Sequence, residues 1–205
     1  MKKEYEFFEL INELQNTKRY VGYHEEFVES VPEHTYKMIV MIDRLYDLLQ
    51  LNLDYRKCIK IAIYHDLCEI GLKQDIDALE AWNNIELQLS KKEQEDKKMR
   101  EISQKYNSEI YDYFKEYEEC ESLEAKFVHA IDKLEANIRV LKESNVKYKD
   151  PDLIAVYAAK AVENFPLLIP FYKELKMVMK ERYKQLSFEW KPEYDFSFEN
   201  HENNN

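Results

Sequence analysis

The sequence predicts an all-α protein, and its composition gives three reasons for this fold class. Glycine occurs only 2 times and proline only 5 times in 205 residues, too few for a sheet protein with many tight turns. Long stretches rich in Glu, Lys, Leu and Tyr favour helices. Hydrophobic residues make up 45% of the chain, which is enough to bury a core between those helices. We therefore expect a single helical bundle.

Apolar residues at helical spacing predict the helices of the N-terminal half. We expect a loop over 17–32 and helices over three ranges: 4–15, from near Pro32 to about Leu51, and Tyr55 to Glu69. Gly71 is expected to end the third helix, because glycine commonly follows a helix C-terminus. The segment 76–89 is amphipathic, and the charged run after it is most simply a solvated helix face.

The C-terminal half is also predicted to be helical. Four further helices are expected over 108–119, 122–143, 152–164 and 167–185. Pro166 and Pro170 mark the break between the last two. The segment after 187 contains Trp, Phe and Tyr, and it ends in ENHENNN, which we expect to be disordered. We predict one domain over residues 1–186, followed by a tail over 187–205.

The net charge and the cysteine content limit which ligands and which cellular compartment are expected. The formal net charge of −11 disfavours a polymeric DNA or RNA ligand, which usually meets a basic face, but a small phosphorylated ligand can still bind through a metal. The three cysteines form no CxxC pair and are expected to be reduced thiols of a cytoplasmic protein. No apolar run reaches the about 20 residues that span a bilayer, and the acidic N-terminus does not resemble a signal peptide. We expect no membrane partner.

A His-Asp doublet stands in one of the most apolar windows of the chain, IKIAIYHDLCEIGL. His65 falls on the same helix face as Cys58, Ile61 and Ala62, and Asp66 follows it. Burying an imidazole and a carboxylate there is costly unless they are paired or bind a metal. For an isolated pair, a hydrogen bond in the core is the more frequent arrangement.

Two other ligand-type residues lie on predicted inward helix faces. His34 precedes Met38 by one turn, and Asp132 lies one turn from both Val128 and Ala136. Two imidazoles and two carboxylates suit a divalent ion such as Mn, Fe, Co, Ni, Zn or Mg. Such an ion polarises phosphorus and lowers the pKa of its bound water, which generates a nucleophile near neutral pH.

The order H…HD…D, with 31 residues from His34 to His65 and 66 from Asp66 to Asp132, resembles the HD-domain metal-dependent phosphohydrolases. The segments ESVPEH (29–34), YHDLCEI (64–70) and EAKFVHAIDKLEA (124–136) resemble those of the YfbR-like group of 5′-deoxynucleotidases. The likeness covers about residues 15–142, and the helices over 151–185 are additional. It implies an HD-domain helical bundle that hydrolyses (deoxy)nucleoside 5′-monophosphates to nucleoside and phosphate.

The resemblance also implies roles for individual residues. The metal ligands would be His34, His65, Asp66 and Asp132. Glu69, one turn after His65, matches the proposed proton-transfer residue of the group. The family's metal dependence and its possible homodimer are expected here as well.

Three further positions follow from the same resemblance. Arg19 matches the arginine that contacts the phosphate and sugar region of the nucleotide. Tyr20 stands where the family has a tryptophan that helps to select deoxyribose. The family's second acidic residue follows a short Gly-Asp turn that this sequence lacks, and Asp75 is the nearest match.

Two alternatives stay open. Related enzymes of the same fold act on (d)NTPs as phosphohydrolases or triphosphohydrolases, and the loops that would discriminate, 17–32 and 70–80, are where this sequence departs from the family. A non-catalytic helical regulatory module that uses its metal structurally is the other alternative, and the intact ligand set with Glu69 argues against it. Lys37, Lys133 and Arg139 are within reach of a phosphate by their position, although ion pairs or solvation are more common for such residues.

Overall fold

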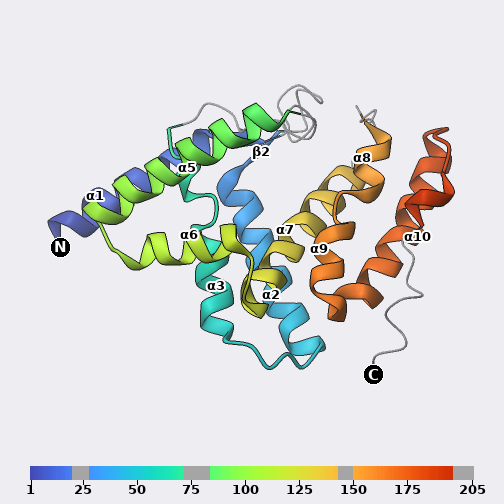
Figure 1. Ribbon diagram of the computed structural model, residues 1–205, viewed down its shortest axis with the longest axis horizontal. Helices are drawn as coiled ribbons and strands as arrows, with labels where there is room; N and C mark the ends of the chain where they lie inside the picture. Colours follow the sequence, from blue (N-terminus) through green and yellow to red (C-terminus); the bar gives the residue numbers. More distant parts are fainter. Residues whose placement is uncertain (20–27, 72–83, 143–149, 196–205) are drawn as a thin grey trace. The chain divides into compact units, whose positions relative to one another are not determined.

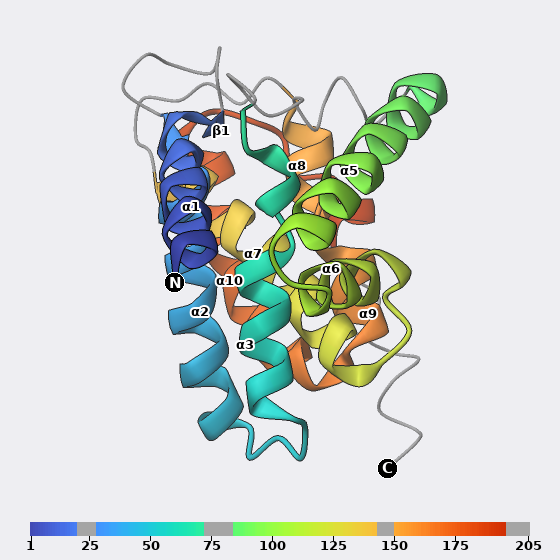
Figure 2. The same ribbon diagram turned by 90° about the vertical axis from the view of Figure 1, so that its left-hand side faces the viewer.

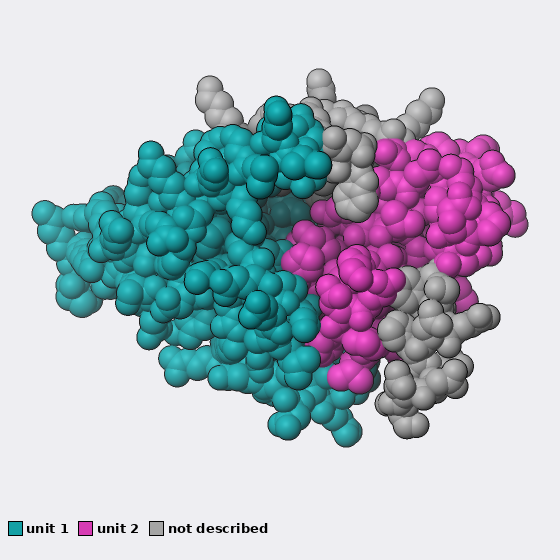
Figure 3. Space-filling model, viewed as in Figure 1, with its two compact units in different colours: residues 1–128 teal, residues 129–205 magenta. Residues whose placement is uncertain are grey.

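A computed structural model of the protein describes residues 1–19, 28–71, 84–142 and 150–195 (Figure 1). Within these ranges helices dominate, and one pair of two-residue strands forms the sheet. The predicted all-α fold class is therefore confirmed. The chain divides into two compact units, Met1–Val128 and His129–Asn205 (Figure 3). The prediction of one domain over 1–186 stays a prediction.

The first unit begins with helix α1 (Lys2–Ile11), which continues into the 3₁₀ turn η1 (Asn12–Asn16). Strands β1 (Lys18–Arg19) and β2 (Glu29–Ser30) then pair antiparallel, with Lys18 opposite Ser30 and Arg19 opposite Glu29. The predicted loop over 17–32 is thus partly a β-ribbon, whose connection over 20–27 lies outside the described residues. This pairing fixes Arg19 beside the start of the next helix.

Helix α2 (Val31–Leu48) begins where the sequence predicts, because Ser30 and Glu33 cap its N-terminus reciprocally. The Glu33 carboxylate accepts hydrogen bonds of 2.7 Å from the backbone N–H and from the hydroxyl of Ser30. Ser30 and Glu33 form a capping box, and Pro32 suits the first turn of a helix. The buried face carries residues at helical spacing: Val31, His34, Met38, Ile42 and Leu45.

Helix α3 (Tyr55–Tyr64) lies beside α2 (Figure 2). Asp54 caps its N-terminus by accepting a 3.0 Å hydrogen bond from the backbone N–H of Lys57. The predicted extension of this helix to Glu69 is wrong. At Asp66 the backbone (φ −102°, ψ 12°) leaves α-helical geometry, and the 3₁₀ turn η2 (Leu67–Glu69) follows. Gly71, at φ +86°, adopts a left-handed conformation that glycine allows without strain.

Two further helices contribute to the core of the first unit. Helix α5 (Ile85–Lys105) packs against η2 and against α6 (Glu109–Glu119), and α6 also packs against α3. Their shared core consists of the buried residues Leu67, Cys68, Ile70, Met99, Ile102, Ile110 and Phe114. The η2 turn is therefore held by this core directly after the His-Asp doublet. Most of the predicted amphipathic segment 76–89 lies outside the described residues.

Helix α7 (Leu123–Lys142) begins in the first unit and ends in the second. The rest of the second unit contains helices α8 (Pro151–Val156), α9 (Ala159–Asn164) and α10 (Ile169–Gln185), with the 3₁₀ turns η3 (Pro166–Leu168) and η4 (Pro192–Tyr194). The predicted helix over 152–164 is two helices, because the backbone at Ala158 (φ −90°, ψ −7°) departs from α-helical geometry.

The beginning of the predicted tail packs within the second unit. Tyr194 is buried, and its ring lies 6.2 Å from that of Tyr183 on α10. The predicted disordered end, residues 196–205, lies outside the described residues. Among the described helices, none is both long and apolar enough to cross a bilayer.

Candidate metal centre

His65 lies directly after the last turn of α3, with its ring buried. Its backbone N–H donates to the carbonyl of Ile61 at 3.0 Å, and its Nδ1 lies 2.8 Å from the carbonyl oxygen of Ala62. A carbonyl oxygen can only accept a hydrogen bond, so Nδ1 carries the proton. In the neutral imidazole, Nε2 then presents a lone pair, as a metal-binding histidine requires.

The carboxylate of Asp66 and the ring of His34 complete a three-residue cluster. Asp66 Oδ2 lies 3.1 Å from His65 Nε2 and 3.9 Å from His34 Nε2. His34 comes from the buried face of α2, whereas the other two come from the end of α3. One ligand atom from each of the three lies within 4.8 Å of the others. A lone pair that faces a carboxylate oxygen is repulsive unless a cation lies between them, so this donor set fits a divalent metal ion.

Asp66 is ionised at neutral pH. Burial disfavours its charged form, but the electrostatic and hydrogen-bond interactions of the carboxylate with His65, Arg19 and His34 outweigh burial and hold the pKa of Asp66 well below its ordinary value. Part of this shift comes from Arg19, whose Nη1 donates to Asp66 Oδ2 at 3.1 Å. The carboxylate is therefore in the state that a metal ligand needs.

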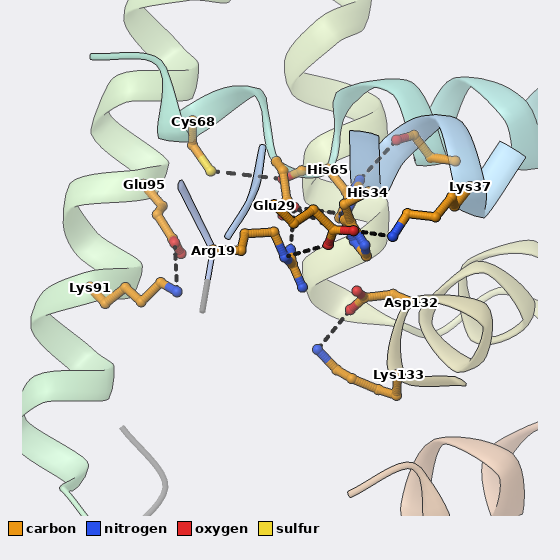
Figure 4. A network of polar contacts seen from close by, with 12 residues as sticks. Arg19, Glu29, His34, Lys37, His65, Cys68, Lys91, Glu95, Asp132 and Lys133 are labelled. Atoms are coloured by element: carbon orange, nitrogen blue, oxygen red, sulfur yellow. Dashed lines mark hydrogen bonds and ion pairs between the residues drawn. The ribbon is translucent and has the colours of Figure 1, made fainter. Parts of the chain in front are cut away.

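Arg19 contacts two carboxylates, those of Asp66 and Glu29. Figure 4 shows Glu29, to which sequence reasoning gave no role, beside Arg19. Its Nη1 contacts Asp66, and its Nε lies 3.8 Å from Oε2 of Glu29, an ion pair beyond hydrogen-bond distance. Oε1 of Glu29 forms an ion pair with Lys37 on α2. Lys37 therefore forms an ion pair, which is a more common role for such a lysine than contact with a phosphate.

Glu69 is buried at the end of η2. Its backbone N–H donates to the carbonyl of Asp66 at 3.1 Å, and its own carbonyl accepts a 3.0 Å hydrogen bond from the hydroxyl of Thr17. Thr17 also accepts, through its backbone carbonyl, from the N–H of Val31 at 3.3 Å. Thr17 therefore joins the β-ribbon, the start of α2 and the Glu69 turn. The 3₁₀ turn, rather than a continuous helix, sets the position of Glu69 relative to His65.

The remaining predicted residues lie in the second unit or outside the described ranges. Asp132 belongs to the second unit, where it is only 4% exposed and its Oδ2 forms a 2.7 Å ion pair with Lys133. Its role as a fourth ligand stays a prediction. Tyr20 and Asp75 lie outside the described residues.

Sequence reasoning missed Glu29 and Thr17. Glu29 opens the segment ESVPEH that ends in His34, so its closeness to a ligand was visible, but its partner Arg19 is ten residues away and the strand pairing was not predicted. Thr17 contacts Glu69 across 52 residues of sequence. No local pattern indicates a contact at that separation.

Comparison with known proteins gives a consistent picture. A family model described as HD domain matches residues 11–164. The human 5′-deoxynucleotidase HDDC2 is 29% identical over 178 residues, covering 83% of this chain and 83% of that protein. The mouse 5′-deoxynucleotidase HDDC2 is 30% identical over 177 residues, covering 83% of this chain and 85% of that protein.

Solved structures share the fold. The PH0347 protein from Pyrococcus horikoshii OT3 is 25% identical, with a TM-score of 0.69 over 85% of this chain and 99% of that one. A predicted metal-dependent phosphohydrolase from Magnetospirillum magnetotacticum MS-1 is 15% identical, with a TM-score of 0.70 over 91% of this chain and 97% of that one. At that identity the second match shows the fold alone.

Proposed function

The chain belongs to the HD domain family, and on that basis we propose that it is a metal-dependent phosphohydrolase that converts (deoxy)nucleoside 5′-monophosphates to nucleoside and phosphate. The relatives named 5′-deoxynucleotidase support this substrate class. The observation that carries the proposal is the convergence of His34, His65 and Asp66, whose ligand atoms lie within 4.8 Å of one another.

Three ligands come from this cluster, and we assign the fourth to Asp132. The support for Asp132 is its place in the order H…HD…D. Two imidazoles and two carboxylates suit Mn, Co, Fe, Ni, Zn or Mg. Such an ion, when bound, lowers the pKa of a coordinated water and polarises the phosphate.

Side chains of the protein transfer the proton and bind the phosphate. Hydrolysis adds water across the bond between phosphorus and the 5′-oxygen: phosphorus gains the water oxygen, and the leaving 5′-oxygen takes a proton. Glu69 transfers that proton, which fits its place three residues after Asp66. Arg19 binds the phosphate through charge-assisted hydrogen bonds, which fits its contact with Asp66 at 3.1 Å.

Sugar selection is assigned to Tyr20 and a second acidic role to Asp75, both on the family resemblance. Tyr20 would stack on the sugar and crowd a 2′-hydroxyl, and because tyrosine is smaller than tryptophan we expect a modest preference for deoxyribose. The ratio of kcat/KM for dAMP to that for AMP tests this. The ratio should fall toward one in Tyr20→Ala, whereas a wild-type ratio already near one would remove the deoxyribose preference.

Phosphate release from a panel of dNMPs, NMPs and dNTPs tests the reaction class. We expect monophosphates to be cleaved in the presence of Mn²⁺ or Co²⁺ and cleavage to stop in EDTA. Release of triphosphate from dNTPs in preference would instead establish the triphosphohydrolase alternative. Metal-bound protein without turnover of any of these nucleotides would favour the regulatory module.

We also place the enzyme in the cytoplasm and expect a homodimer. The three cysteines remain thiols, in keeping with a reducing compartment. The homodimer rests on the family resemblance alone, and a molar mass of twice the 24.9 kDa chain in light scattering would confirm it.

A further inference from the structure

We propose that Glu29 is a positioning residue that holds the guanidinium of Arg19 at the metal centre, with Lys37 balancing its charge. The inference rests on the proposed function, because it takes Arg19 as the residue that contacts the substrate phosphate. Glu29 itself does not contact the substrate in this account. It acts through Arg19.

The backbone places Glu29 and Arg19 together. They are directly opposite each other in the β1–β2 ribbon, and directly opposite residues of an antiparallel pair have adjacent side chains. The next residue, Ser30, belongs to the capping box that starts α2, the helix of His34. Arg19 is therefore tied, through Glu29, to the element that carries one of the proposed metal ligands.

The charges around Glu29 indicate that it fixes the position of the Arg19 guanidinium. Its side chain is only 3% exposed, and a carboxylate so buried is costly unless cations face it. Each of its oxygens faces a different cation: Oε1 pairs with Lys37 and Oε2 with Arg19 Nε. Arg19 is itself only 13% exposed, so its guanidinium is fixed between Glu29 and Asp66 rather than extended into solvent.

The two carboxylates at Arg19 are not equivalent. Its Nη1 contacts Asp66 Oδ2, the same oxygen that faces the ring nitrogens of His34 and His65. An oxygen that also serves a metal ion attracts a guanidinium less strongly. Glu29 then provides the second anchor, at the Nε end of Arg19 (Figure 4), while Nη1 contacts Asp66 of the metal centre. A preorganised guanidinium binds a phosphate with less loss of side-chain entropy.

A competing role for Glu29 is to orient His34. One of its carboxylate oxygens lies within 4.8 Å of a ring nitrogen of His34. If Glu29 acted through His34, its removal would weaken metal binding. If it acts through Arg19, its removal weakens phosphate binding and leaves the metal in place. Bound metal per chain therefore separates the two roles.

A double-mutant cycle on the full-length, Mn²⁺-loaded protein tests the proposal. The four proteins are wild type, Arg19→Ala, Glu29→Gln and the double variant, and the readouts are KM for dAMP, the inhibition constant of inorganic phosphate and bound metal. Glu29→Gln should raise both KM and the inhibition constant by about 10-fold, with metal content unchanged. In the Arg19→Ala background, the same change should add less than about 2-fold, because its target is gone.

Glu33→Ala is the matched control. Glu33 serves the same strand–helix junction through Ser30, so its loss should lower thermal stability without changing phosphate affinity. Glu29→Asp keeps the charge, so its KM and its inhibition constant should lie between those of wild type and of Glu29→Gln. If Glu29→Gln does not fold, Glu29→Asp takes its place in the cycle.

Independent, multiplicative effects of Glu29→Gln and Arg19→Ala would overturn the positioning role, as would loss of metal in Glu29→Gln. If Arg19→Ala itself left phosphate affinity unchanged, the phosphate contact assigned under the proposed function would fail, and the positioning role with it. The two failures are thus distinguishable.

Discussion

The hydroxyl of Thr17 gives a sharp test of how the site is assembled. It donates a 3.0 Å hydrogen bond to the carbonyl of Glu69, and Thr17 is fully buried. Thr17→Val removes this donor and replaces the hydroxyl with a methyl of similar size. The strand that carries Arg19 and the turn that carries Glu69 would then lose one direct connection.

The expected cost follows from that one bond. Leaving a buried carbonyl without this donor costs about 1–3 kcal/mol. For a chain of this length each kcal/mol lowers the Tm by about 2–4 °C, so we expect a fall of about 2–12 °C. A displaced Glu69 should also lower kcat, by about 10-fold for a shift well under 1 Å. Differential scanning calorimetry and phosphate-release kinetics measure the two effects.

Thr17→Ser is the control, because it keeps the hydroxyl and loses only a methyl group. It should retain most of the wild-type kcat even if its Tm falls. An unchanged Tm and kcat in Thr17→Val would refute this reasoning, since the hydrogen bond would then contribute nothing to stability or to the position of Glu69.

Two further predictions concern a proton donor and a buried amine. Glu69→Gln should lower kcat by about 10²–10⁴ with bound metal near the wild-type amount, and loss of the metal would contradict the role as proton donor. Burial lowers the pKa of Lys176 from 10.5 to about 8, so the unfolded chain binds more protons between these values and stability should rise with pH across them. Lys176→Met should remove that rise in the urea midpoint between about pH 8 and pH 10, and an equal rise in both proteins would contradict the assignment.

The helices were predictable where local signals agree. For α2, the capping residues Ser30 and Glu33, the proline at 32 and the apolar spacing all indicate the same start, and the helix begins one residue before Pro32. The family and the clustering of His34, His65 and Asp66 were likewise predictable, because the order and flanking segments of these residues carry that information in the sequence itself.

The features that sequence reasoning missed are long-range or irregular. The apolar pattern runs on through LCEI, so nothing local shows that α3 stops before His65 and turns into η2. Strands of two residues are too short to show an alternating pattern, which hid the pairing of Arg19 with Glu29.

Lys176 is another such case. It lies mid-helix in a charged segment and reads as a solvated side chain. In the structure its ammonium donates to the carbonyls of Ala155 and Tyr194. These acceptors come from elements that only the folded second unit brings together.

A binding titration tests most directly whether His34, His65 and Asp66 hold a divalent ion. Metal-free protein is titrated with Mn²⁺, and bound metal per chain is measured for wild type, His65→Ala and Thr17→Val. We expect one tightly bound ion in wild type and in Thr17→Val, which is destabilised but keeps every proposed ligand. In His65→Ala the affinity should fall by at least about 100-fold. Equal stoichiometry and equal Kd in wild type and His65→Ala would contradict the account.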